Sequence, residues 1–105
     1  MHHSPTDKVP VMVVFDLPED WPRALAEAIP EQRNIVNRLL ADGVVQSYSV
    51  SADRTTVWMV LVVEEVAGAV EDVVDTFPIV AFADYRYEPL LFTNDSSSVM
   101  HYSLN

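Results

Sequence analysis

The ten residues from Thr55 to Glu64 constrain the fold more than any other part of the chain. Side chains on a β-strand alternate between the two faces of a sheet. Both alternating sets are apolar here: Val57, Met59, Leu61 and Val63 on one face, and Trp58, Val60 and Val62 on the other. A strand with one face in water would alternate apolar and polar residues. The stretch therefore predicts a central strand that is covered on both faces.

The rest of the chain predicts three more strands and two helices. We expect strands at Val9–Leu17, Val44–Ser51 and Ile79–Pro89, and helices at Asp20–Asp42 and Val66–Phe77. The first of these strands is also apolar on both faces, whereas the second mixes polar and apolar residues, as is typical of a sheet edge. One of its faces is predicted to carry Val44, Gln46, Tyr48 and Val50, and the other Val45, Ser47, Ser49 and Ser51.

Local signals predict where the helices begin and end. Asp20 is placed to cap the first helix, and Pro30 lies inside its pattern, so we expect a kink or break near Ile29. Gly43 is expected to end this helix in left-handed geometry. The residues Ser51–Arg54 predict a hairpin turn into the central strand.

The element order β-α-β-β-α-β is that of the ferredoxin-like, or split βαβ, motif. It predicts an α+β fold with a four-stranded antiparallel sheet in the order 4-1-3-2. The right-handed crossover rule places both helices on one face. The two strands that are apolar on both faces then become the central pair, and the second sheet face stays uncovered. We therefore predict a homodimer that closes sheet on sheet.

Composition narrows the function classes. The 105 residues predict a single domain, with residues 1–8 as a loose arm and 93–105 as a tail. A net charge of −10 argues against nucleic acid and anionic membranes as partners. Cysteine is absent and no metal cluster or phosphate loop is found, so we predict no metal and no cofactor. An N-terminal signal pattern is missing, which makes the cytoplasm the expected location.

The run Phe77–Leu90 carries a resemblance to a known family. An apolar-proline pair, an aromatic residue at Phe82, an aspartate at Asp84 and a Pro-Leu exit follow one another there. This pattern resembles the end of muconolactone isomerase-like proteins. The resemblance implies a dimeric α+β barrel, sometimes assembled into larger rings, that transfers a proton within a small lactone. The sequence departs from the family in having Arg86 in place of an acidic residue, and it has no histidine between His3 and His101.

Three charged residues of the last predicted strand share one face: Asp84, Arg86 and Glu88. A carboxylate in an apolar cleft can be tuned to transfer protons, and an arginine can hold a substrate carboxylate. We therefore predict catalytic roles for Asp84 and Glu88 and a substrate-binding role for Arg86. The predicted walls of a pocket for a flat ring are the aromatic residues Tyr48, Trp58, Tyr85 and Tyr87.

These residues also have purely structural interpretations. Charges on an edge strand prevent aggregation, and aromatic residues on strands commonly fill a core or an interface. The leading hypothesis is a proton-transfer isomerase that acts on a small cyclic carboxylic acid or lactone. The alternatives are a non-catalytic small-molecule-binding or assembly domain, and a cofactor-free monooxygenase suggested by analogy of fold alone.

Overall fold

A computed structural model describes residues 8–93 of the chain. Seven elements follow one another along it: β1 (Val9–Asp16), α1 (Arg23–Ala41), β2 (Val45–Val50), β3 (Thr56–Val63), α2 (Val66–Val74), the 3₁₀ helix η1 (Pro78–Phe82) and β4 (Asp84–Pro89). Residues 1–7 of the predicted arm and 94–105 of the predicted tail, which include His2, His3 and His101, lie outside the described residues.

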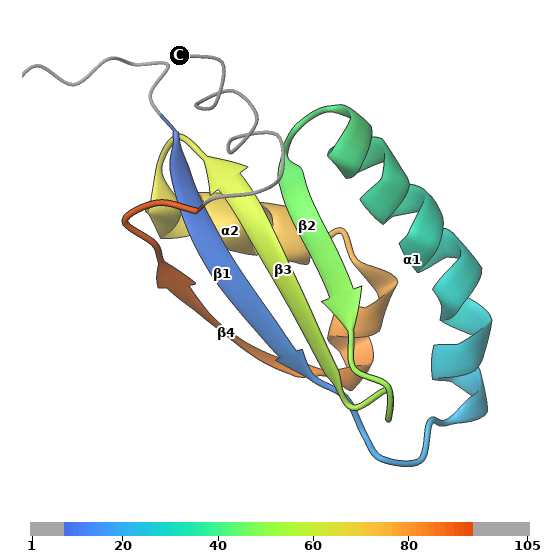
Figure 1. Ribbon diagram of the computed structural model, residues 1–105. Helices are drawn as coiled ribbons and strands as arrows, with labels where there is room; N and C mark the ends of the chain where they lie inside the picture. Colours follow the sequence, from blue (N-terminus) through green and yellow to red (C-terminus); the bar gives the residue numbers. More distant parts are fainter. Residues whose placement is uncertain (1–7, 94–105) are drawn as a thin grey trace, which may run out of the picture.

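The four strands form one antiparallel sheet in the order β2-β3-β1-β4. This is the predicted order read from the other edge, so the ferredoxin-like α+β prediction is confirmed. Both helices lie on one side of the sheet, with α1 alongside β2 and α2 behind β1 and β3 (Figure 1). None of the helices in the described part of the chain is long and apolar enough to cross a membrane.

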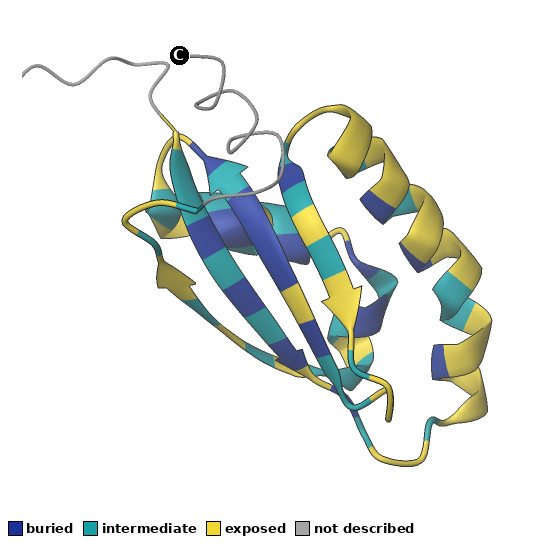
Figure 2. Cartoon of the chain, viewed as in Figure 1, coloured by how far each residue is buried: buried dark blue, intermediate teal, exposed yellow. Residues whose placement is uncertain are grey.

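The core lies between the sheet and the helices. Val57, Met59, Leu61 and Val63 of β3 are buried there, as are Val11, Val13 and Phe15 of β1. Val70 and Val74 of α2 cover them, and Phe77 packs its ring against that of Phe15 at a centroid distance of 6.1 Å. Figure 2 shows the resulting alternation of buried and less buried residues along β1, whereas β3 contains a continuous buried run from Met59 to Leu61. The two faces predicted for the central stretch are therefore correct.

The face of the sheet without helices, here called the open face, carries the other alternating set. Its central residues are Met12 and Val14 of β1 and Trp58, Val60 and Val62 of β3. Within the single chain Val60 is buried, Met12, Val14 and Val62 are half-buried, and Trp58 keeps 42% of its surface exposed.

The first helix differs from its prediction in two ways. Pro22, and not Asp20, occupies the N-cap position, and no side chain caps this end. The helix also continues through Pro30, so the break predicted as one alternative near Ile29 does not occur. Ala26, whose carbonyl loses its partner at Pro30, is exposed, so water can satisfy that oxygen. Gly43 has the predicted left-handed backbone, with a φ of 78°.

The second helix is shorter than predicted. It ends at Val74, and the backbone of Ala67 and Gly68 is not helical, with a φ of 84° at Gly68. A left-handed residue interrupts the hydrogen-bond ladder, so only the middle of the predicted Val66–Phe77 span, from after Gly68 to Val74, is regular helix.

The last predicted strand begins too early. Residues Pro78–Phe82 form η1, and only Asp84–Pro89 pair as β4. The backbone N–H of Ile79 donates to Oε1 of the buried Gln32 at 3.2 Å, so η1 is held against α1 and cannot extend the sheet.

The second strand contains an irregularity that changes its register. Val45 lies opposite Leu61 but Ser47 lies opposite Val60, so Gln46 is bulged out of the ladder. The helix-facing residues of β2 are therefore Val45, Tyr48 and Val50. The prediction that Val45 lies on the face opposite Tyr48 and Val50 is therefore wrong, because a bulge shifts the alternation by one residue.

Candidate functional site

The sheet separates the seven predicted site residues into two groups. Four of them lie on the open face, because they pair in register with open-face positions of β1: Trp58 of β3 and Asp84, Arg86 and Glu88 of β4. Tyr48, Tyr85 and Tyr87 lie on the helix face. Tyr48 is moreover on β2, at the opposite edge from β4. The fold therefore does not bring the predicted acid-base residues and the three tyrosines into one cleft.

The charged group on β4 is partly neutralised within the chain. Arg86 Nη1 lies 2.8 Å from Asp16 Oδ2, and both side chains are more than half exposed. Arg86 and Glu88 border a small hollow of about 140 Å³ on the open face, together with Met12 and Val14. This volume is below that of typical small-molecule sites, which hold roughly 300–1,000 Å³.

The two tyrosines of β4 fasten the edge of the sheet to its surroundings. Tyr85 packs against Phe15 at a centroid distance of 5.7 Å. The Tyr87 hydroxyl donates a 2.8 Å hydrogen bond to Glu71 of α2. This bond lowers the pKa of the Glu71 carboxyl and raises the pKa of Tyr87, because it favours the ionised acid and the protonated phenol.

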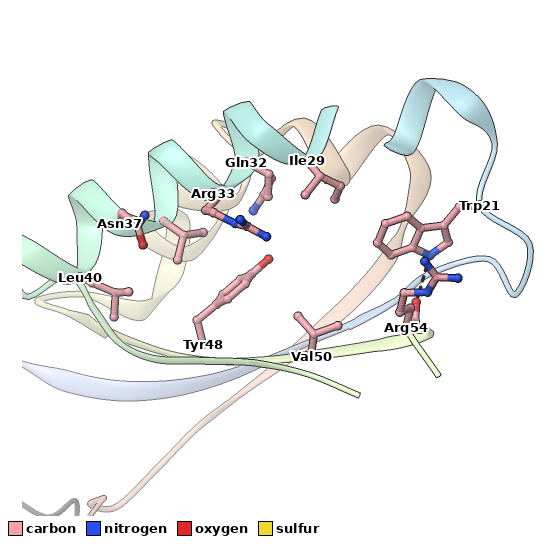
Figure 3. Close-up of a pocket in the computed structure, with 10 residues that line it drawn as sticks. Trp21, Ile29, Gln32, Arg33, Asn37, Leu40, Tyr48, Val50 and Arg54 are labelled. Carbon is pink, nitrogen blue, oxygen red and sulfur yellow. Dashed lines mark hydrogen bonds between the residues drawn. The ribbon is translucent and has the colours of Figure 1, made fainter. Parts of the chain in front are cut away.

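A larger pocket, here called the α1–β2 pocket, opens between the first helix and the second strand. It has a volume of about 480 Å³ (Figure 3). Its apolar walls come from one turn after another of α1 and from the end of β2: Ile29, Val36, Leu40 and Val50. Among the predicted site residues only Tyr48 lines it.

Two polar side chains lie in the interior of the α1–β2 pocket. Gln32 is only 2% exposed, and its Oε1 accepts the Ile79 N–H, so its Nε2 is the free donor end of the amide. Nε2 is buried and lies beyond hydrogen-bond distance from every described group, the neighbouring Tyr48 hydroxyl included. Burial raises the pKa of the Tyr48 hydroxyl because it disfavours the phenolate, and the nearby Gln32 amide, which would donate to a phenolate, offsets this only partly. Tyr48 therefore keeps its proton at neutral pH.

The mouth of the pocket is built by the β2–β3 hairpin and by Trp21, which precedes α1. Trp21 Nε1 donates to the Arg54 carbonyl at 3.0 Å, and the Arg54 guanidinium lies 5.2 Å from the centre of the indole ring. Arg54 has a positive φ of 65°. Asp53 holds this turn through hydrogen bonds from Ser51 and Thr55 to its Oδ1, which also lower the pKa of its carboxyl.

The charge around the α1–β2 pocket is opposite to that of the whole chain. The sequence has sixteen acidic residues against six basic ones. The residues that line this pocket nevertheless include Arg33 and Arg54 and no aspartate or glutamate. The pocket is therefore a positive region on an acidic protein, and it favours an anionic or electron-rich occupant.

A third hollow lies between the end of β3 and α2. It has a volume of about 650 Å³, and its polar side chains are Glu64, Glu65 and Asp72. No aromatic side chain and no hydrogen-bond donor side chain lines it. The α1–β2 pocket is the better candidate because it combines apolar walls with buried donors.

Sequence reasoning missed most of this site. Arg54 fitted a solvated hairpin turn, and Gln32 fell within the apolar stripe of the first helix. A glutamine on an otherwise apolar helix face was the one available signal, because a buried amide needs partners.

Comparison with known proteins adds no family to this geometry: no family model matches the chain, and no curated protein matches it significantly.

Proposed function

We propose that this protein is a small-molecule-binding domain whose ligand occupies the α1–β2 pocket. The observation that carries the proposal is the pocket itself. It has a volume of about 480 Å³, four aliphatic residues form its walls, and the buried Gln32 Nε2 beside it has no hydrogen-bond partner within residues 8–93. This volume lies within the range of about 300–1,000 Å³ that accommodates small ligands. The resemblance to muconolactone isomerase-like proteins is compatible with binding a small ring compound.

The groups at this pocket favour binding over proton transfer. Among its lining residues, Tyr48 and the two arginines are the only ionisable ones, and Tyr48 holds its proton at neutral pH. A general base must have its lone pair available near the working pH. The predicted acid-base residues Asp84 and Glu88 lie on the opposite face of the sheet.

The residues predicted to carry out the isomerase reaction lie elsewhere in the fold, on the open face. Arg86 and Glu88 border the open-face hollow of about 140 Å³, and Asp84 lies on the same strand face. That hollow becomes an enclosed site only if another molecule covers it. Proton transfer by these residues is therefore a second candidate function that depends on a dimer.

We also infer that a second copy of the chain covers the open face. Trp58 and half-buried aliphatic residues of β1 and β3 form its centre. Two-fold association would place this surface against itself, with about 800 Å² buried per partner in an interface of ordinary size. The charged residues of β4 would then lie at the rim.

Nuclear magnetic resonance with a fragment set of aromatic and alicyclic acids, amides and lactones tests the proposed binding function. The chain has two tryptophans, one at the pocket mouth and one on the open face. We expect ligands to shift the indole N–H resonance of Trp21 and to leave that of Trp58 unchanged.

Two neighbouring substitutions on α1 provide a matched pair for the same experiment. Asn37 lines the pocket and Arg38 does not, and both are exposed. Asn37→Trp should fill the cavity and abolish binding, whereas Arg38→Trp should preserve it. If no fragment moves the Trp21 resonance, or if both variants bind like the original protein, the proposed function is refuted.

A further inference from the structure

We propose that the ligand of the α1–β2 pocket is a small carboxylate with a flat apolar body, and that Arg33 and the side-chain amide of Gln32 bind its carboxylate group. This inference rests on the proposed function, because it names the chemical class that the same pocket accepts.

The first observation is the fixed orientation of the Gln32 amide. Its Oε1 accepts the N–H of Ile79 at 3.2 Å, so the amide cannot flip without leaving that buried N–H unpaired. The Nε2 group is thereby directed elsewhere, and it has no hydrogen-bond partner although it is fully buried. A buried donor without a partner carries an energetic cost that an incoming oxygen atom would remove.

The second observation is the state of Arg33, the next residue of α1. Arg23 pairs with Glu27 at 3.4 Å, and Arg86 pairs with Asp16. For Arg33, no carboxylate of residues 8–93 lies within ion-pair distance, although the chain is rich in acids. Figure 3 shows its guanidinium directed over the pocket toward the hydroxyl end of Tyr48, with Gln32 beside it.

These groups together specify an acceptor with negative charge. Arg33 supplies a charged donor, Gln32 a neutral donor, and Tyr48 a hydroxyl that retains its proton. A carboxylate offers two oxygens and about four acceptor sites, so it can satisfy all three. The aliphatic walls suit an apolar body attached to that group. A cationic amine would face two arginines and no counter-charge, and is excluded on this ground.

The experiment compares acids with their own primary amides. Benzoate, phenylacetate, 3-phenylpropanoate and cyclohexanecarboxylate are each titrated beside the corresponding amide, by calorimetry and by the Trp21 indole resonance. The amide keeps the shape and one carbonyl oxygen but loses the charge. We expect the acid of each binding pair to bind more tightly by about tenfold or more, the size of one charge-assisted hydrogen bond.

Two arginine substitutions on α1 locate the effect. Arg33→Met removes the charge and keeps most of the aliphatic length, and Arg38→Met is the control because that side chain does not line the pocket. Arg33→Met should weaken acid binding by about tenfold or more and change amide binding by less than about twofold. Arg38→Met should leave both affinities unchanged. Circular dichroism checks that each variant is folded.

The outcomes separate this inference from the proposed function. If the acids bind more tightly than their amides and Arg33→Met selectively weakens acid binding, both the binding function and the carboxylate assignment are supported. Acids and amides that bind equally well, or an Arg33→Met variant that binds acids normally, would overturn the carboxylate assignment and leave the binding function standing. If neither acids nor amides bind while other fragments do, the assignment is again overturned. If nothing binds, both proposals fail.

Discussion

Replacing Trp58 with lysine tests whether a second copy covers the open face. Trp58 lies opposite Val14 in the centre of that face and keeps 42% of its surface exposed in the single chain. Lysine lowers the net negative charge of a chain whose net charge is −10, so dissociation would not come from greater overall repulsion between the copies. It would come from the lost apolar contact and from the cost of burying an ammonium group.

The expected size of the effect follows from the exposed surface. A buried aromatic side chain removes roughly 150–250 Å² from water, so the exposed part of Trp58 offers about 100 Å² per copy. At about 25 cal/mol per Å², its burial would contribute about 2.5 kcal/mol. A two-fold interface contains the residue twice, which gives about 5 kcal/mol, or between three and four orders of magnitude in Kd.

Sedimentation velocity over a roughly hundredfold range of concentration measures this change. We expect the original protein to sediment as a dimer and Trp58→Lys as a folded monomer. Leu40→Lys is the control, because Leu40 is similarly exposed at 39% but lies on α1, away from the open face. A monomeric original protein, or a Trp58→Lys variant that still dimerises, would show that the open face does not mediate association.

Two further predictions concern stability. Gly43→Ala should lower the free energy of unfolding by about 1 kcal/mol, which corresponds to about 4–8 °C in Tm. The reason is the backbone φ of 78°, which disfavours any side chain, and not a clash, because the added Cβ would meet no atom within 4 Å. An unchanged Tm would contradict this. Tyr87→Phe removes the hydrogen bond that lowers the pKa of the Glu71 carboxyl. That bond stabilises the folded protein at pH values above the unfolded-state pKa of Glu71, and this stabilisation is lost as the pH falls through the folded-state pKa. The Tm of this variant should therefore be lower at neutral pH and should depend less on pH between about pH 5 and 3. Tyr85→Phe, whose hydroxyl has no hydrogen bond within residues 8–93, should retain the original pH dependence.

The arrangement of the sheet was predictable because it depends on patterns that are local in the chain. Residues Val57–Val63 alternate two apolar sets, and the order of the elements restricts which strands can be central. One departure from prediction arose where a distant residue intervenes. Residues 79–82 are apolar and were predicted as strand, yet the buried Gln32 side chain accepts a hydrogen bond from the Ile79 N–H, and the segment packs against α1 as a 3₁₀ helix.

The candidate pocket was much less predictable. Gln32, Tyr48 and Arg54 belong to a helix, a strand and a turn, and no spacing in the sequence relates them. The bulge at Gln46 decides that Tyr48 faces the helix together with Val45, and a one-residue difference in register would have turned it to the open face.

The sequence by itself determined the α+β class, the strand order and the two apolar faces of the central strands, because burial follows from the alternation of side chains. Only the tertiary structure decided which side of the sheet each set of β4 residues faces: the charged residues lie on the open face and Tyr85 and Tyr87 face the helices. It also placed beside one pocket a buried amide donor and an arginine that has no ion-pair partner among residues 8–93. The reason is physical: hydrogen-bond partners and charges act across space, between residues that the chain brings together only when it is folded.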